Sequence, residues 1–184
     1  MSDSLIAEEQ QAIEASLRRE CSRLGWWGVA ALAGGCLLLG RVWAWDSALQ
    51  WLPQAGLVWA FIYYQARQRL SLNRSDPRAP LYAALGGANR LTLLRAWLIA
   101  AVAGFLFQPW PEGPALSWLP GMLYLFAAVL DRVDGYVARR SGQSSQLGND
   151  LDTISDALGL AVASLLAFGY GQVHWSYLLF GAAY

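Results

Sequence analysis

The chain has 184 residues, of which 56% are hydrophobic and only 14% are charged, and its formal net charge at pH 7 is zero. Ten of the residues are tryptophan. This composition is too apolar for a soluble domain of this size, and it therefore predicts a membrane protein. We expect no nucleic-acid partner.

The first 22 residues are charged and lack the apolar core of a signal peptide. Apolar residues nevertheless recur there at spacings of seven, four, four and three, which places them on one face of a helix. They are Ile6, Ile13, Leu17, Cys21 and Leu24. We interpret this segment as an amphipathic interfacial helix on the cytoplasmic leaflet. A solvated helix or a tail that binds a partner is the alternative.

Five apolar segments approach or reach the roughly 20 residues that a helix needs to cross the hydrocarbon of a bilayer. They cover about 26–45, 48–66, 89–107, 115–131 and 153–170. A sixth begins at Trp175 and runs to the end of the sequence. The sequence thus predicts an all-α fold, a polytopic transmembrane helical bundle that follows an N-terminal amphipathic interfacial helix.

The basic residues predict the orientation of these spans, because basic loops stay on the cytoplasmic side of a membrane. All 13 basic residues are arginines. If the spans alternate in direction, twelve of the 13 fall on one side and only Arg41 on the other. We therefore expect an integral membrane protein with its N-terminus in the cytoplasm. The membrane that we expect is the inner membrane of a bacterium.

The chain divides into two parts. Residues 1–70 contain the amphipathic helix and two spans, and they carry no obvious chemistry. Residues 71–184 begin with a polar linker and continue with "GGANRLTLLR", which turns at two glycines and enters the third span. Asn89, Thr92 and Arg95 are expected at the cytoplasmic end of that span.

Acidic residues gather at the ends of the fourth and fifth spans, in "DRVDGYVARRSGQSSQLGNDLDTISD". Asp131 and Asp134 are three residues apart, so on a helix they project from one face. Asp152 and Asp156 are four apart and do the same. The short connection between the pairs contains glycine and lets the two helices fold back antiparallel. Four carboxylates should therefore converge on one pocket, on the cytoplasmic side.

Such a cluster needs cations or protons, because like charges about 4 Å apart repel by about 4 kcal/mol per pair at an effective dielectric near 20. Carboxylate oxygens suit Mg²⁺ or Mn²⁺, and two divalent ions would neutralise four carboxylates. Arg139 and Arg140 beside them indicate a diphosphate ligand. Gly135 and Gly148 would let a nucleotide or phosphate approach the backbone. The stretch predicts phosphoryl transfer, with one aspartate deprotonating an acceptor hydroxyl.

The spacing of these residues resembles, in full, the signature of the CDP-alcohol phosphatidyltransferases, class I. The pattern is D-x2-D-G-x2-A-R-x8-G-x3-D-x3-D over residues 131–156. The resemblance extends over about residues 79–184, and "NRLTLLR" is similar to the start of the first core helix of the family. It implies phospholipid synthesis in which a CDP-linked lipid, CDP-diacylglycerol, gives its phosphatidyl group to a small alcohol and CMP is released.

The resemblance also implies roles for individual residues. The ligands of a two-ion Mg²⁺ or Mn²⁺ site are Asp131, Asp134, Asp152 and Asp156, and Asp156 is also the catalytic base. The donor-binding positions are Gly135, Arg139, Ser145 and Gly148, with Asn89 and Thr92 reaching the donor as well. The acceptor is left open among glycerol phosphate, serine, inositol or its phosphate, choline, ethanolamine and phosphatidylglycerol. A homodimer is compatible with the family.

Several features lie outside the pattern. The family usually has six core spans, whereas this sequence supplies three and the start of a fourth, so we expect a chain truncated at its C-terminus. The two spans within residues 26–66 are an addition to the core. Asp150 is expected to cap the fifth span together with Asn149. Arg140 is expected to contact solvent or a lipid headgroup.

Three other classes of protein stay open. An intramembrane prenyltransferase also holds Mg²⁺ and a diphosphate between Asp-rich helix ends, but its paired motifs lie far apart in sequence. A carrier of divalent cations would place acidic residues at mid-membrane. A non-catalytic membrane protein that binds lipid or nucleotide is the third, and CMP release from CDP-diacylglycerol separates all three from the transferase.

Overall fold

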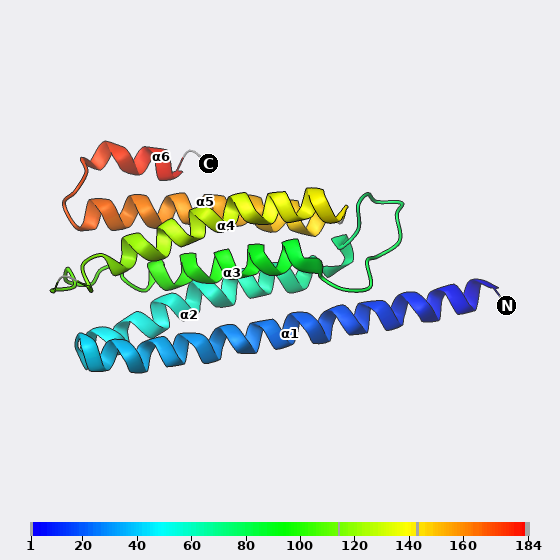
Figure 1. The fold of residues 1–184 in the computed structure, drawn as a ribbon, viewed down its shortest axis with the longest axis horizontal. Helices are drawn as coiled ribbons and strands as arrows, with labels where there is room; N and C mark the ends of the chain where they lie inside the picture. The colour runs from blue at the N-terminus through cyan, green and yellow to red at the C-terminus, as the bar shows by residue number, and fades with distance from the viewer. Residues whose placement is uncertain (1, 114, 143, 183–184) are drawn as a thin grey trace.

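A computed structural model describes residues 2–113, 115–142 and 144–182 (Figure 1). The described chain is helical and contains no strand, which confirms the predicted all-α fold. The elements are α1 (Ser2–Val42), α2 (Trp45–Gln68), the 3-10 turn η1 (Leu70–Leu72), α3 (Gly86–Ala103), α4 (Leu119–Ser141), α5 (Gln146–Gly169), the 3-10 turn η2 (Trp175–Tyr177) and α6 (Leu178–Ala182).

The five long helices lie roughly side by side, and α6 folds back along α5 (Figure 1). Helix α1 forms one side of the bundle and packs mainly on α2. Helix α3 has the central place, since it packs against α2, α4 and α5. Side chains on the face of α3 that is directed toward α4 and α5 therefore lie among three helices.

Helix α1 is a single helix that contains both the predicted interfacial segment and the first predicted span. Its glycines do not interrupt it. A methyl group on Gly25 would lie 2.5 Å from the ring of Tyr63, and one on Gly28 would lie 2.3 Å from the ring of Trp59. These glycines therefore let α2 approach α1 closely, and the packing offsets the low helix propensity of glycine.

The apolar face of the first half of α1 is used inside the protein. Leu17 and Cys21 are buried, and they belong to the same apolar core as Leu70 and Leu85. Ile13 packs against that core as well. The face that the sequence suggested for a membrane surface thus covers the region around η1 and the start of α3.

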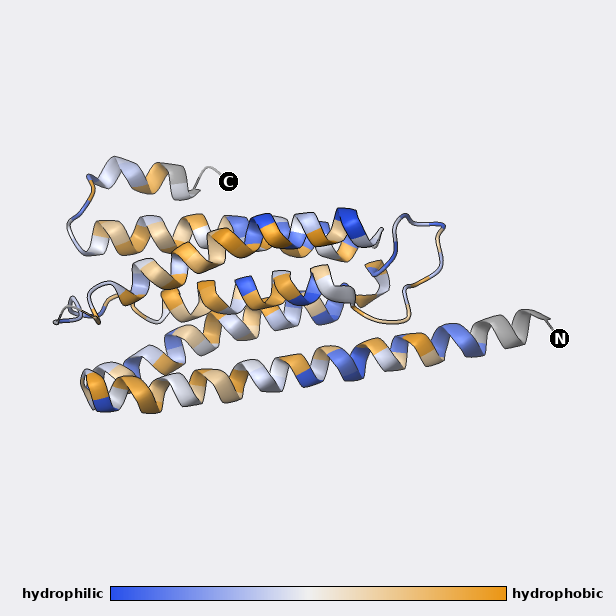
Figure 2. Cartoon of the chain, in the orientation of Figure 1, coloured by the Kyte–Doolittle hydropathy of each residue, from blue (hydrophilic) through white to orange (hydrophobic). Residues whose placement is uncertain are grey.

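Two of the described helices, α1 and α5, are long and apolar enough to cross a membrane. The other long helices do not combine the required length with the required hydropathy. Large apolar side chains are nevertheless exposed on the outside of the bundle, among them Trp26, Trp27 and Leu57, each 73% exposed. Hydrophilic residues gather where α4 ends and α5 begins, and in the first half of α1 (Figure 2). This distribution is typical of a protein with a lipid-facing belt and one polar end.

Tryptophan indoles join the first two helices to the rest of the bundle. Trp59 of α2 donates a hydrogen bond to the carbonyl of Gly25 at 3.1 Å. Trp97 of α3 donates to the carbonyl of Gly28 at 3.0 Å, and Trp51 of α2 donates to the carbonyl of Ala101 at 3.0 Å. These three hydrogen bonds fix the positions of α1, α2 and α3 relative to one another. They thereby fix α3, which contributes to the candidate site described below.

Candidate functional site

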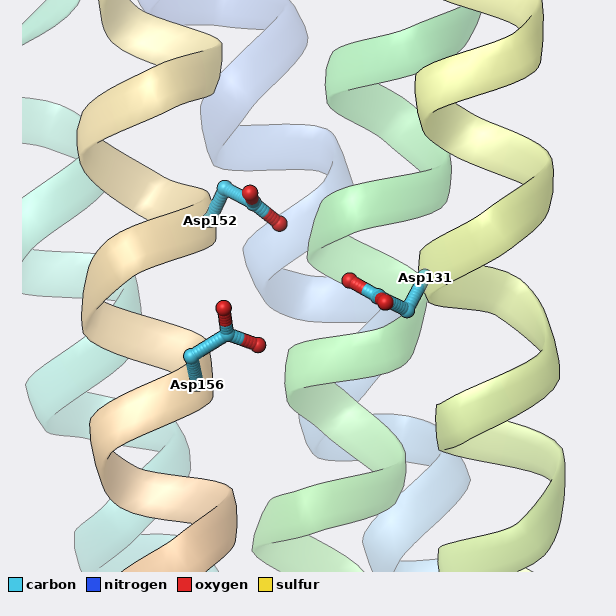
Figure 3. A group of neighbouring side chains, drawn as sticks. All are labelled: Asp131, Asp152 and Asp156. Atoms are coloured by element: carbon cyan, nitrogen blue, oxygen red, sulfur yellow. The ribbon is translucent and has the colours of Figure 1, made fainter.

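Three aspartates meet between α4 and α5. Asp131 leaves α4, while Asp152 and Asp156 leave successive turns of α5, and all three side chains point into the same space in front of α3 (Figure 3). One carboxylate oxygen from each lies within 4.8 Å of those of the other two. The spacing of four residues in α5 accounts for the shared direction of its two aspartates.

The donor set of this cluster fits a hard divalent cation. It consists of carboxylate oxygens, which are the ligands that Mg²⁺ and Mn²⁺ prefer. Oxygens bound to one such ion at about 2.0–2.2 Å lie at most about 4.4 Å apart. The separations within 4.8 Å therefore need only small side-chain rotations to match an ion.

Asp134 lies one turn along α4 from Asp131 and is buried, at 6% exposure. Its Oδ2 accepts a hydrogen bond from the hydroxyl of Thr92 at 3.0 Å. The same oxygen is 3.8 Å from Nη1 of Arg95. Asp134 thus borders the three-carboxylate cluster and is held there by α3.

Arg95 of α3 lies at the centre of all four predicted metal ligands. Its Nη1 is 2.6 Å from an oxygen of Asp131 and 2.5 Å from an oxygen of Asp152. Its Nη2 donates a hydrogen bond to Asp156. The side chain of Arg95 is only 3% exposed. One buried guanidinium therefore supplies the positive charge that draws four carboxylates together.

The sequence motif assigns no role to Arg95. A signal was present, because Asn89, Thr92 and Arg95 are spaced by three and so share one face of α3. All three are buried, at 4%, 4% and 2% exposure. A charged residue inside an apolar helix is rare and is generally paired with an opposite charge. That rule, applied to Arg95, points to the acidic cluster.

A cavity beside the aspartates brings together five of the six predicted donor-binding residues. Its lining includes Asn89, Thr92, Gly135, Ser145 and Gly148, together with Asp134 and Asp152. Arg139 does not line it. Its exposed side chain lies over Gly135, where an added methyl group would be 3.3 Å from Nη1 of Arg139. Asp152 belongs to both this cavity and the acidic cluster, and Asp134 lines the cavity beside that cluster, so a ligand in the cavity would lie directly against the aspartates.

Ser145 begins α5. Its Oγ accepts a hydrogen bond from the backbone N–H of Gly148 at 3.0 Å, which makes it the N-cap. The prediction that Asp150 caps this helix with Asn149 is wrong, because the helix begins at Gln146 and both residues lie inside it. Asp150 instead pairs with Arg69 at 3.4 Å.

Gly148 is in close contact with α3. A methyl group at Gly148 would lie 2.5 Å from Oδ1 of Asn89. Asn89 also exchanges hydrogen bonds with Ser145, from its Nδ2 to Oγ at 3.0 Å and from Oγ to its Oδ1 at 3.1 Å. The absence of a side chain at position 148 thus lets the first turn of α5 approach α3.

Arg140 is exposed and does not line the cavity beside the aspartates. Its Nη1 donates a hydrogen bond to the hydroxyl of Tyr136, one turn earlier on α4, at 2.9 Å. This position leaves the guanidinium in contact with the surroundings of the protein, and away from the acidic cluster.

A second cavity lies on the other side of the cluster, between α3, α4 and α5. Arg95, Asp131 and Asp156 line it, together with Tyr124 and Ser155. Among the described residues, the buried Oγ of Ser155 has no hydrogen-bond partner. The acidic cluster is therefore accessible from two cavities, one of which contains Asp152 and the other Asp156.

The chain is similar to known enzymes of lipid metabolism. The CDP-diacylglycerol–glycerol-3-phosphate 3-phosphatidyltransferase of Pectobacterium atrosepticum is 35% identical over 85 residues, which are 46% of this chain and 45% of that protein. The protein of the same name from Cereibacter sphaeroides is 36% identical over 89 residues, 47% of this chain and 38% of that protein. The chain thus spans less than half the length of these curated relatives. No solved structure matches it.

A family model described as CDP-alcohol phosphatidyltransferase matches residues 86–184, which is more than half of the chain. This match includes α3, α4 and α5, and with them every residue of the acidic cluster and of the two cavities. On this match, the chain belongs to the CDP-alcohol phosphatidyltransferase family.

Proposed function

We propose that this protein is a metal-dependent enzyme of phospholipid synthesis that transfers a phosphatidyl group from CDP-diacylglycerol to a small alcohol and releases CMP. The observation that carries the proposal is the acidic cluster of Asp131, Asp152 and Asp156 beside a cavity lined by the predicted donor-binding residues. Family membership favours this reaction over the prenyltransferase and cation-carrier alternatives.

The four aspartates, Asp131, Asp134, Asp152 and Asp156, would hold two Mg²⁺ or Mn²⁺ ions. Bound there, the ions would neutralise the diphosphate of the donor and the charge that builds on the leaving phosphate. Arg95 already occupies the centre of this cluster. We propose that the guanidinium of Arg95 moves away from the centre of the cluster when the ions bind. It then remains a positive group beside the diphosphate.

Asp156 would act as the base. Its carboxylate takes the proton from the acceptor hydroxyl, and the hydroxyl oxygen forms a bond to the phosphorus of the phosphatidyl group. The bond from that phosphorus to the oxygen bridging the two phosphates breaks, and CMP leaves with the bridging oxygen. The cavity that Asp156 lines, on the opposite side from the donor cavity, offers the acceptor a separate approach.

The donor would lie in the cavity between α3, α4 and the start of α5. Gly135 and Gly148 present bare backbone there, and Asn89, Thr92 and Ser145 offer hydrogen-bonding groups. Arg139, whose exposed guanidinium lies over Gly135, would cover the donor phosphates from outside. As the acceptor to test first we propose glycerol 3-phosphate, which the names of the bacterial relatives contain.

The two apolar helices and the bacterial relatives indicate a membrane protein. We propose that it is integral to the inner membrane of a bacterium, with its N-terminus and its active site on the cytoplasmic side. The arginine distribution and the polar end of the bundle in Figure 2 support this orientation. We further propose that residues 1–70 form an addition to a core of residues 71–184. A homodimer stays a prediction.

The test is CMP release by the purified protein from CDP-diacylglycerol, with Mg²⁺ or Mn²⁺, across a panel of glycerol 3-phosphate, serine, inositol, inositol phosphate, choline, ethanolamine and phosphatidylglycerol. We expect CMP release that requires one of these alcohols and one of these ions. Binding of CDP-diacylglycerol without CMP release from any alcohol would instead support the non-catalytic alternative.

A further inference from the structure

We propose that Asn73, in the linker between α2 and α3, is a positioning residue that fixes the side chain of Asn89 and thereby the donor cavity. This inference rests on the proposed function, since it concerns the binding of the nucleotide donor. Asn73 precedes the part of the chain that matches the family model, which begins at residue 86. It is fully buried, at 0% exposure.

The side-chain amide of Asn73 has only one orientation that satisfies its surroundings. Its Nδ2 donates hydrogen bonds to two backbone carbonyls, that of Ala84 at 2.9 Å and that of Tyr82 at 3.4 Å. A carbonyl accepts and cannot donate, so the amide nitrogen must face these two groups. The side-chain oxygen of Asn73 is therefore directed to the opposite side, toward α3.

That oxygen in turn determines the orientation of Asn89. Nδ2 of Asn89 donates to Oδ1 of Asn73 at 3.0 Å. With its nitrogen held in this way, Asn89 directs its own Oδ1 toward the hydroxyl of Ser145, at 3.1 Å, and toward Gly148. The reversed amide would place the oxygen of Asn89 against Oδ1 of Asn73 and would leave that buried oxygen of Asn73 without its donor, which costs free energy.

The linker carbonyls thus fix the amide of Asn73, Asn73 fixes the amide of Asn89, and Asn89 contacts the N-terminal turn of α5. Ser145, the last member of this chain of hydrogen bonds, accepts from the N–H of Gly148. Asn89, Ser145 and Gly148 all line the donor cavity. Asn73 does not, so it acts on the donor only through Asn89.

Two further contacts hold the linker against the same turn. The backbone N–H of Gln146 donates to the carbonyl of Arg74 at 2.9 Å. The hydroxyl of Tyr82 donates to the carbonyl of Ser144 at 3.2 Å. The linker therefore lies along the outer edge of the donor cavity. It is hydrogen-bonded to α3 and to the start of α5, the two elements that flank it there.

Helix α1 supports the start of α3 from the other side. Glu20, buried at 9% exposure, accepts a hydrogen bond from the backbone N–H of Leu85 at 3.0 Å. It also accepts one from Nε of Arg90 at 2.8 Å. The first turn of α3, which contains Asn89, is thus anchored by two groups upstream of the family match, and Asn73 is the one that contacts Asn89 itself.

The test measures binding of CDP in the presence of Mg²⁺, by calorimetry, to the full chain and to three variants. Asn73→Ala should weaken CDP binding about tenfold, because it leaves the amide of Asn89 without its partner. Ser75→Ala, an exposed site in the same linker, is the matched control and should leave CDP binding unchanged. Asn73→Asp keeps the side-chain size and an acceptor for Asn89 but cannot donate to the carbonyls of Ala84 and Tyr82, so the side chain is no longer held in place and CDP binding should weaken as well. This variant provides the measurement if Asn73→Ala does not fold.

A double-mutant cycle distinguishes positioning from a general loss of structure. If Asn73 acts through Asn89, then Asn73→Ala should have little further effect on CDP affinity once Asn89→Ala is present. Losses that add in full would overturn the proposal. The KM for CDP-diacylglycerol should rise in Asn73→Ala while kcat and the Mg²⁺ requirement stay within about twofold of the parent.

Hydrogen exchange makes this test independent of the enzymatic proposal. The backbone amides of residues 146–149 should exchange faster in Asn73→Ala than in the parent, and at the parental rate in Ser75→Ala. Equal exchange in all three proteins would overturn the positioning role. If the parent neither binds CDP nor releases CMP, the proposed function fails, and the exchange rates alone still decide whether Asn73 fixes the turn.

Discussion

The two halves of the bundle are held together by different means. Between α1 and α2, glycines face aromatic rings, as Gly25 faces Tyr63 and Gly28 faces Trp59. Between α3, α4 and α5, one buried arginine is surrounded by four carboxylates. The first interface depends on shape and tolerates no added volume, whereas the second depends on charge and should respond to ions. Substitutions in the two halves should therefore differ in how their effect on stability depends on divalent ions.

The largest effect is expected for Asp156→Asn in the charged half. An amide cannot take the proton of the acceptor hydroxyl, so CMP release should fall by about 10²- to 10⁴-fold. Binding of CDP should fall much less than CMP release, because Asp156 lies outside the donor cavity and three of the four proposed metal ligands remain. Asp150→Asn, on the same helix but paired with Arg69, is the control and should keep most of the activity. Undiminished turnover in Asp156→Asn would refute the assigned base.

Arg95→Met should cause the next largest effect, on stability. Removing one partner of a fully buried ion pair costs about 3–5 kcal/mol, and the loss here should be smaller, because water reaches three of the four carboxylates. The loss should be measured by thermal unfolding without divalent ions, and added Mg²⁺ or Mn²⁺ should restore much of it, because the ions supply the missing charge.

Arg140→Met is the control for that comparison. Arg140 is exposed, and its loss should change the free energy of unfolding by no more than about 0.5 kcal/mol. An Arg95→Met protein as stable as the parent without divalent ions would show that the guanidinium does not hold the carboxylates together.

Gly28→Ala addresses the apolar half. Its methyl group would lie 2.3 Å from the ring of Trp59, so α1 and α2 must separate or the ring must turn. Overpacking of this kind costs about 1–3 kcal/mol. Thermal unfolding should show this loss with and without divalent ions alike, in contrast to Arg95→Met.

Gly34→Ala provides the matched control in the same helix. No atom lies within 4 Å of a methyl group at that position. Alanine has the higher helix propensity, so Gly34→Ala should be neutral or stabilising by up to about 1 kcal/mol. Equal destabilisation by both substitutions would mean that contact with Trp59 is not the cause.

The spacing of the aspartates was sufficient to predict much of the candidate site. Helical periodicity alone places Asp152 and Asp156 on one face of α5, and the short connection to α4 brings Asp131 to them. The short connection between α4 and α5 also explains why residues on both sides of it, such as Gly135 and Gly148, line one cavity. These relations need only the geometry of two neighbouring helices.

Other features depend on contacts between distant parts of the chain, and local patterns could not predict them. Arg95 reaches the aspartates only because α3 packs against both α4 and α5. The continuity of α1 through Gly25 and Gly28 depends on rings supplied by α2. The N-cap of α5 is Ser145 and not Asp150, and the start of the helix also forms hydrogen bonds with Asn89 and the linker, which lie far from it in sequence.

The most direct test of the account is the binding of Mn²⁺, measured by electron paramagnetic resonance on the full chain. We predict that two Mn²⁺ ions bind per chain and that Asp131→Asn and Asp152→Asn each weaken this binding by at least about tenfold, while Asp150→Asn leaves it unchanged. Parental Mn²⁺ binding in both cluster variants, or none in the parent, would contradict the claim that these aspartates form a metal site.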